Sequence, residues 1–127
     1  MKPHRQSLYR AFRCAIRGIL TAVQTERNMK IHIAAALIVF IAAALLQLDR
    51  ISWLFLLLAV SIVFIAELVN TAVEAIIDLI SPDEHELARV AKDTAAGAAF
   101  VAAAFAVVIG ILVFYEPVWE WIQSLTS

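Results

Sequence analysis

The sequence predicts an all-α integral membrane protein, and three observations support that fold class. The chain of 127 residues is 63% hydrophobic and 17% charged, with a mean hydropathy of +0.87. Soluble domains are about 45–50% apolar and about 25% charged. Three long apolar stretches follow one another from residue 31 onwards, after a basic N-terminal segment. These features exclude a disordered chain, a disulfide scaffold and an ordinary water-soluble globule.

The N-terminal segment predicts an amphipathic surface helix over residues 5–26. Arg10, Arg13 and Arg17 recur at helical spacing and form a basic face. A helix of this kind suits the surface of an anionic membrane. No apolar core follows directly on a short basic start, so the segment is not expected to be a signal peptide. The apolar residues on the other side are Leu8, Phe12, Ile16, Ile19 and Val23.

Three transmembrane spans are expected, over residues 30–48, 51–80 and 88–115, within a single domain. A spanning helix needs about 20 predominantly apolar residues. The run Thr94–Tyr115 carries no charge and meets that length outright. The alternative, a buried helical bundle in a soluble protein, has too few polar residues to cover its surface.

The segment Ser81–Glu84 predicts the start of a helix. Ser81 can cap the first amides, Pro82 suits the first helical position, and Glu84 falls at the third. We therefore expect a short helix that begins here and leads into the third span.

The distribution of basic residues predicts the orientation in the membrane. Seven Lys and Arg residues precede the first span, and Arg50 lies in the turn after it. The positive-inside rule then places the N-terminus and residues 81–93 in the cytoplasm, and the C-terminus outside. The expected location is the cytoplasmic (inner) cell membrane, and the net charge of −1 argues against nucleic acid as a partner. The seven residues are Lys2, Arg5, Arg10, Arg13, Arg17, Arg27 and Lys30.

Four polar residues share one face of the second span: Glu67, Asn70, Glu74 and Asp78. At 1.5 Å per residue, Glu67 lies roughly 24 Å and Glu74 roughly 35 Å from the start of the span. The hydrocarbon core is about 30 Å thick. Glu67 is therefore expected inside the core near its cytoplasmic edge, and Glu74 at the interface.

The other two spans bring polar residues to the same level, and their chemistry suits phosphoryl transfer. Carboxylates and substrate phosphates hold Mg²⁺, a carboxylate can act as general base, and a lysine can clamp phosphate. Interfacial charges that pair to orient the helices are the alternative for any one residue. A non-enzymatic ion or proton pathway, or an accessory subunit, is the alternative for the whole set. The residues are Glu26, Asn28, Lys30 and His32 around the cytoplasmic start of the first span, and Arg89, Lys92 and Asp93 at the cytoplasmic start of the third.

Three segments carry a resemblance to a known family. Glu67–Asp78 (ELVNTAVEAIID) and Ala91–Ala98 (AKDTAAGA) resemble the signature of the small prokaryotic membrane diacylglycerol kinases. Glu26–His32 (ERNMKIH) resembles the branch of Gram-positive bacteria whose member is an undecaprenol kinase. The resemblance implies a homotrimeric bundle that uses ATP and Mg²⁺ to phosphorylate the hydroxyl of a membrane lipid. Undecaprenol is the leading substrate, and diacylglycerol is the alternative.

The resemblance also implies roles for individual residues. Glu67 matches the general base that takes the proton of the lipid hydroxyl, and Glu26 and Glu74 match metal ligands. For contact with phosphate, Arg10 and Arg13 are alternatives to Arg17. The residues expected on the lipid side are Glu67, Asn70, Asn28 and His32. Those expected on the nucleotide side are Arg17, Glu26, Glu74, Asp83, Glu84, His85, Lys92 and Asp93.

Overall fold

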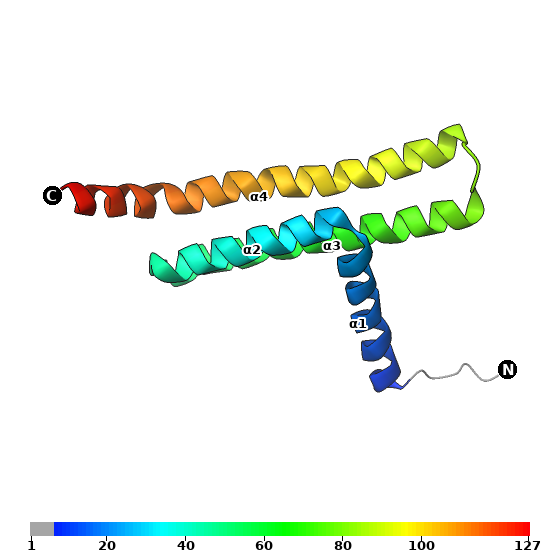
Figure 1. The fold of residues 1–127 in the computed structure, drawn as a ribbon, viewed down its shortest axis with the longest axis horizontal. Helices are drawn as coiled ribbons and strands as arrows, with labels where there is room; N and C mark the ends of the chain where they lie inside the picture. The colour runs from blue at the N-terminus through cyan, green and yellow to red at the C-terminus, as the bar shows by residue number, and fades with distance from the viewer. Residues whose placement is uncertain (1–6) are drawn as a thin grey trace.

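The computed structural model describes residues 7–127, which form four helices joined by short connections. Helices α2, α3 and α4 run side by side, whereas α1 leaves this bundle at a steep angle (Figure 1). The all-α prediction is confirmed. Lys2, Arg5 and the first two residues of the expected surface helix lie outside the described part of the chain. The helices are α1 Leu8–Thr25, α2 Arg27–Leu45, α3 Arg50–Ile80 and α4 Glu86–Thr126.

Helix α1 is amphipathic and packs against the bundle near its C-terminal end, where Ala22 is buried. The Oγ of Ser7 caps the helix by accepting a hydrogen bond from the backbone N–H of Arg10. Phe12 and Ile16 are each more than half exposed. Glu26 has an extended backbone, which breaks the helix and redirects the chain into α2. The apolar side of α1 is therefore free to contact lipid.

A tight turn joins α2 to α3. Gln47 adopts a left-handed backbone with a φ of 54°, and the carboxylate of Asp49 accepts a hydrogen bond from the backbone N–H of Ser52 at 3.1 Å. Beside the turn, the rings of Phe40 and Trp53 stack with their centroids 5.7 Å apart. We call this end of the bundle the turn end, and the opposite end, which carries residues 81–85, the loop end (Figure 1).

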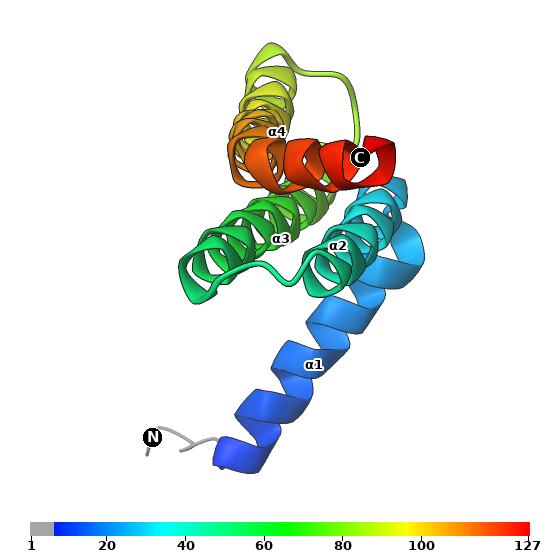
Figure 2. The ribbon, with the colours of Figure 1, turned by 90° about the vertical axis from the view of Figure 1, so that its left-hand side faces the viewer.

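Helix α3 packs against both other long helices. Leu56, Ala59 and Val63 are buried on one face at spacings of three and four, and Glu67 and Asn70 continue the same buried face. Helix α4 packs along α3 over much of its length, and α2 packs on α3 while making little contact with α4. Figure 2 shows this arrangement from the turn end, with α4 lying over α3 and α2 beside them.

The predicted helix start at Ser81 is wrong. Ser81 ends α3, and its hydroxyl donates a hydrogen bond to the backbone oxygen of Asp83 at 3.1 Å instead of capping a new helix. Helix α4 begins at Glu86, where Nδ1 of His85 accepts a hydrogen bond from the N–H of Leu87 at 3.1 Å. There is no separate short helix before the third span, since α4 runs without interruption to Thr126.

Helices α2, α3 and α4 are each long and apolar enough to cross a membrane. At 31 and 41 residues, α3 and α4 are longer than the roughly 20 residues that a span requires. Both extend past the start of α2 at the loop end (Figure 1). Large apolar side chains remain exposed along all three helices, and a bilayer accommodates such a surface. The chain is a multi-pass membrane protein with three candidate spans.

Candidate active site

A buried carboxylate lies at the contact between α2 and α3. Glu67 is 4% exposed, and its Oε1 lies 3.0 Å from Nε2 of His32. His32 lies on the same face of α2 as the buried residues Met29 and Ala36. The regular buried faces of the two helices therefore bring together two polar side chains that are 35 residues apart in the sequence.

Glu67 and His32 line a cavity of about 380 Å³ between the three long helices. Helix α4 closes one side with Phe100 and small residues, so this wall is apolar. An apolar groove of about 210 Å³ continues towards the turn end and shares His32 and Ala103 with the cavity. The complete lining of the cavity is Asn28, Ile31, His32, Glu67, Asn70, Ala96, Ala99, Phe100 and Ala103.

Asn70 contributes an unpaired acceptor to this cavity. Its Nδ2 donates to Oε1 of Glu74 at 3.4 Å. Its Oδ1 is buried, with no hydrogen-bond partner among residues 7–127. The assignment of the two amide atoms follows from chemistry, since a carboxylate accepts hydrogen bonds and does not donate them. A buried acceptor without a donor lowers the stability of the fold. This oxygen is therefore suited to accept a hydrogen bond from a hydroxyl group of a ligand.

A second polar cavity, of about 620 Å³, lies at the loop end. Lys92 on α4 forms an ion pair with Asp78 on α3 across this cavity. Arg89 pairs with two acids of its own helix, Glu86 at 2.6 Å and Asp93 at 3.1 Å. The lining residues are Asp78, Ser81, Pro82, Asp83, Glu84, His85, Glu86, Arg89, Lys92 and Asp93. We call this the loop cavity.

The loop cavity contains five of the residues expected on the nucleotide side and omits three. Arg17 is exposed on α1, Glu26 is partly exposed at the junction of α1 and α2, and Glu74 lies on α3 next to Asn70. Within the described chain, no cluster of three or more acid, histidine or cysteine side chains could hold a metal ion. The five that line the cavity are Asp83, Glu84, His85, Lys92 and Asp93.

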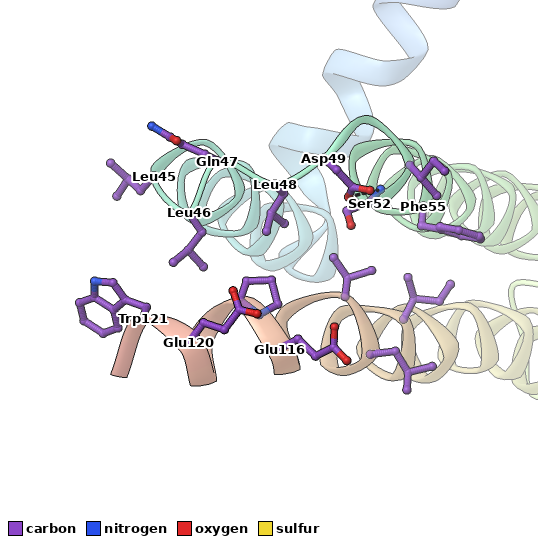
Figure 3. A pocket seen from close by; sticks show the side chains of 15 residues that line it. Leu45, Leu46, Gln47, Leu48, Asp49, Ser52, Phe55, Glu116, Glu120 and Trp121 are labelled. Atoms are coloured by element: carbon purple, nitrogen blue, oxygen red, sulfur yellow. Dashed lines mark hydrogen bonds between the residues drawn. The ribbon is translucent and has the colours of Figure 1, made fainter. Parts of the chain in front are cut away.

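Another cavity lies at the turn end and has a different character. It measures about 930 Å³, and its lining combines apolar residues with Gln47, Ser52 and the acids Asp49, Glu116 and Glu120 (Figure 3). Asp49 is already engaged as the cap of α3. No lysine, arginine or histidine lines this cavity. A base and a cation suited to phosphoryl transfer are found instead towards the loop end.

The sequence did not reveal two features of these sites. One is the pairing of His32 with Glu67, because it depends on the register between two helices. The other is the pairing of Arg89 with Glu86 and Asp93 in the loop cavity, although the sequence placed Arg89 among the polar residues at this level. The spacing of three and four residues between Arg89 and these two acids was the available signal for those ion pairs.

Comparison with known proteins gives consistent matches. Residues 13–114 match the family model described as prokaryotic diacylglycerol kinase. The chain is 43% identical to the undecaprenol kinase of Bacillus subtilis, over 89% of this chain and 94% of that protein. It is also 43% identical to a diacylglycerol kinase of Synechocystis, over 84% of this chain and 62% of that protein. The diacylglycerol kinase of Escherichia coli K12 is 30% identical, over 79% of this chain and 82% of that protein.

Proposed function

Because the chain belongs to the prokaryotic diacylglycerol kinase family of lipid kinases, we propose that Glu67 is the general base for transfer of a phosphoryl group from ATP to a membrane lipid. The family implies ATP as the phosphoryl donor. The observation that carries the proposal is the burial of Glu67 in a cavity with an apolar wall and an apolar groove leading to it. A lipid can place its tail along such a groove and its hydroxyl beside the carboxylate.

On the lipid side, the hydroxyl gives its proton to the carboxylate of Glu67 as its oxygen attacks the γ-phosphorus of ATP. The bond from that phosphorus to the bridging oxygen breaks, and ADP leaves. The free Oδ1 of Asn70 lies in the same cavity and can hold the hydroxyl by accepting its hydrogen bond before the proton passes to Glu67. Asn28 and His32 line the same cavity and complete the proposed lipid site. Catalysis then depends mainly on positioning and charge neutralisation.

On the nucleotide side, the proposed site is the loop cavity. Lys92 supplies a positive charge for the phosphates, and it must leave Asp78 to do so. Arg17 on α1 is a candidate for a further phosphate contact, with Arg10 and Arg13 as alternatives. The remaining proposed contacts are Glu26, Glu74, Asp83, Glu84, His85 and Asp93.

Mg²⁺ is proposed as the cofactor, with Glu74 and Glu26 as its protein ligands. Mg²⁺ is usually bound by one or two carboxylates together with substrate phosphates. One oxygen of Glu74 faces a weak donor, Nδ2 of Asn70 at 3.4 Å, so this carboxylate can turn to a cation. Glu74 is therefore available to a metal that arrives with ATP. When bound, the ion would neutralise charge on the phosphates.

Undecaprenol is the proposed lipid, and diacylglycerol is the second candidate. The chain is equally identical to a kinase named for each lipid. The match covers 94% of the undecaprenol kinase and 62% of the diacylglycerol kinase with that identity. The fuller coverage and the segment Glu26–His32 favour undecaprenol.

We also propose that the whole chain works as one kinase domain within a homotrimer, with its N-terminus and active site facing the cytoplasm and its C-terminus outside. The basic residues before α2 support the orientation. The limited contact between α2 and α4 leaves the cavity open at its side. A neighbouring copy of the chain could close that side.

The direct test is phosphate transfer from γ-labelled ATP by the purified protein in mixed micelles with Mg²⁺. Undecaprenol and diacylglycerol are offered together at equal concentration. Preferential labelling of undecaprenol is expected. Preferential labelling of diacylglycerol would establish the second candidate, and labelling of neither by folded protein would contradict the proposed activity.

A further inference from the structure

We propose that His32 is a positioning residue for Glu67: it holds one carboxylate oxygen so that the other faces the lipid hydroxyl. This inference rests on the proposed function of Glu67. It adds a second role to the place of His32 in the lining of the proposed lipid site.

The geometry of the pair supports this role. Nε2 of His32 lies 3.0 Å from Oε1 of Glu67, within the range of a good hydrogen bond. The side chain of Glu67 is 5% exposed and that of His32 is 22% exposed. His32 is therefore the more accessible partner of the pair. With Oε1 engaged, Oε2 is the oxygen left to accept the proton of the substrate.

Among the described residues, no side chain other than His32 holds the carboxylate of Glu67. The hydrogen bonds made by residues 7–127 include none from a second side chain to the carboxylate of Glu67. The amide group of Asn70 is directed to Glu74, and Thr71 donates to the backbone oxygen of Glu67. The residues that α4 contributes to this cavity are alanines and a phenylalanine, which have no donor to offer. The orientation of the carboxylate therefore depends on His32.

Such a constraint affects the rate because general base catalysis needs the base within hydrogen-bond reach of the proton. A displacement of about 1 Å can reduce a rate by about 100-fold. Without His32, the carboxylate could rotate towards Asn28 or the open side of the cavity. We expect loss of His32 to lower kcat by roughly 10- to 100-fold, with little change in the KM for ATP.

Three substitutions distinguish positioning from other roles. His32→Gln keeps an N–H donor at the distance of Nε2, His32→Asn keeps an amide that is one methylene shorter, and His32→Leu removes the donor. We expect His32→Gln to retain activity within about threefold of wild type. His32→Asn and His32→Leu should each lower kcat by roughly 10- to 100-fold, because the carboxylate of Glu67 is then misplaced. Thermal unfolding and binding of a fluorescent ATP analogue check that each variant is folded.

The outcomes separate the two proposals. Full activity of His32→Leu would overturn the positioning role, and so would equal activity of the Gln and Asn variants. A higher KM for the lipid at unchanged kcat would also overturn it, because it would show that His32 contacts the substrate without positioning Glu67. If His32→Leu fails to fold, the Gln and Asn pair still decides. An inactive wild-type protein would contradict the proposed function itself.

Discussion

Glu67 and Asn70 occupy positions on α3 that the helix otherwise fills with Leu56, Ala59 and Val63. Apolar residues there would pack against α2 and α4 without desolvating a charge or an amide. Burying such polar groups costs free energy unless they are well paired, and Asn70 keeps an unpaired oxygen. A stabilising role therefore explains this pair of residues poorly, whereas a ligand-binding role explains the open acceptor.

Part of this site could be predicted from single residues and part could not. The shared face of Glu67, Asn70 and Glu74 could be predicted from the sequence, because a helix places residues three or four apart on one face. The contact between His32 and Glu67 was not visible, because the register of α2 against α3 depends on the turn at Gln47 and on close packing at Ala36 and Ala43. Local patterns do not specify either one.

At the residue scale, Lys92→Gln should weaken use of ATP. A hydrogen bond to a charged group contributes about 1.5–3 kcal/mol, so the KM for ATP should rise roughly 10- to 100-fold while the KM for the lipid stays constant. Steady-state kinetics with each substrate varied in turn measure both values. Lys30→Gln removes the same charge from the exposed start of α2 and serves as the control. An equal rise of the KM for ATP in both variants would show a general effect of charge and contradict a specific contact between Lys92 and the phosphates.

At the scale of the helices, long apolar runs and local capping signals differ in how well they predict structure. The three spans were predictable because no soluble element needs so many consecutive apolar residues. The start of α4 was not, because Ser81 can either cap a new helix or end the preceding one. Helix α3 continues to Ile80 with Ser81 as its C-cap, and α4 begins at Glu86.

Asp49 provides a prediction at the same scale, because it caps α3. Hydrogen bonding from Ser52, through the side chain first and then the backbone amide, lowers the pKa of Asp49 from its ordinary value. A lowered pKa in the folded state means that the ionised carboxylate stabilises the fold at neutral pH. This contribution is lost as the pH falls through the folded-state pKa. Asp49→Ala should therefore lower the unfolding midpoint at pH 7 by about 2–4 °C.

The pH dependence and a control complete this test. Thermal unfolding in detergent should show the difference between wild type and Asp49→Ala shrinking below about pH 4. Asp49→Asn should lose less stability than Asp49→Ala at pH 7, since an amide oxygen can also cap a helix. Glu120→Ala removes an exposed acid at the same end of the bundle and should have little effect. A constant difference at all pH values would contradict the role of the charge.

At the scale of the whole molecule, the paired polar side chains of the candidate site lie towards the loop end. The His32–Glu67 pair, the Asn70–Glu74 pair and the loop cavity follow one another along α3. The apolar groove approaches this series from the middle of the bundle. A lipid that arrives within the membrane and a nucleotide that arrives from water can therefore meet near Glu67. The sequence predicted the order of Glu67 and Glu74 along α3 from their depth, and the family resemblance implied the division into a lipid side and a nucleotide side.

The proposed orientation predicts opposite labelling of the two ends of the chain. Cys14 is exposed on α1 and is the one cysteine of the sequence. A membrane-impermeant maleimide should label it in lysed cells but not in intact spheroplasts. Ser127→Cys in a Cys14→Ser background should be labelled in intact spheroplasts. The reverse pattern would contradict the orientation, and with it the access of cytoplasmic ATP to the loop cavity.

The central claim is that Glu67 takes the proton of the lipid hydroxyl, and the activity of Glu67→Gln tests it most directly. Single-turnover transfer of labelled phosphate to the preferred lipid is measured for wild type, for Glu67→Gln and for Glu116→Gln as a matched control at the turn end. Loss of the base should reduce the rate by about 100-fold or more, with folding and ATP binding intact and the control unchanged. Transfer by Glu67→Gln within a few-fold of wild type would contradict the account.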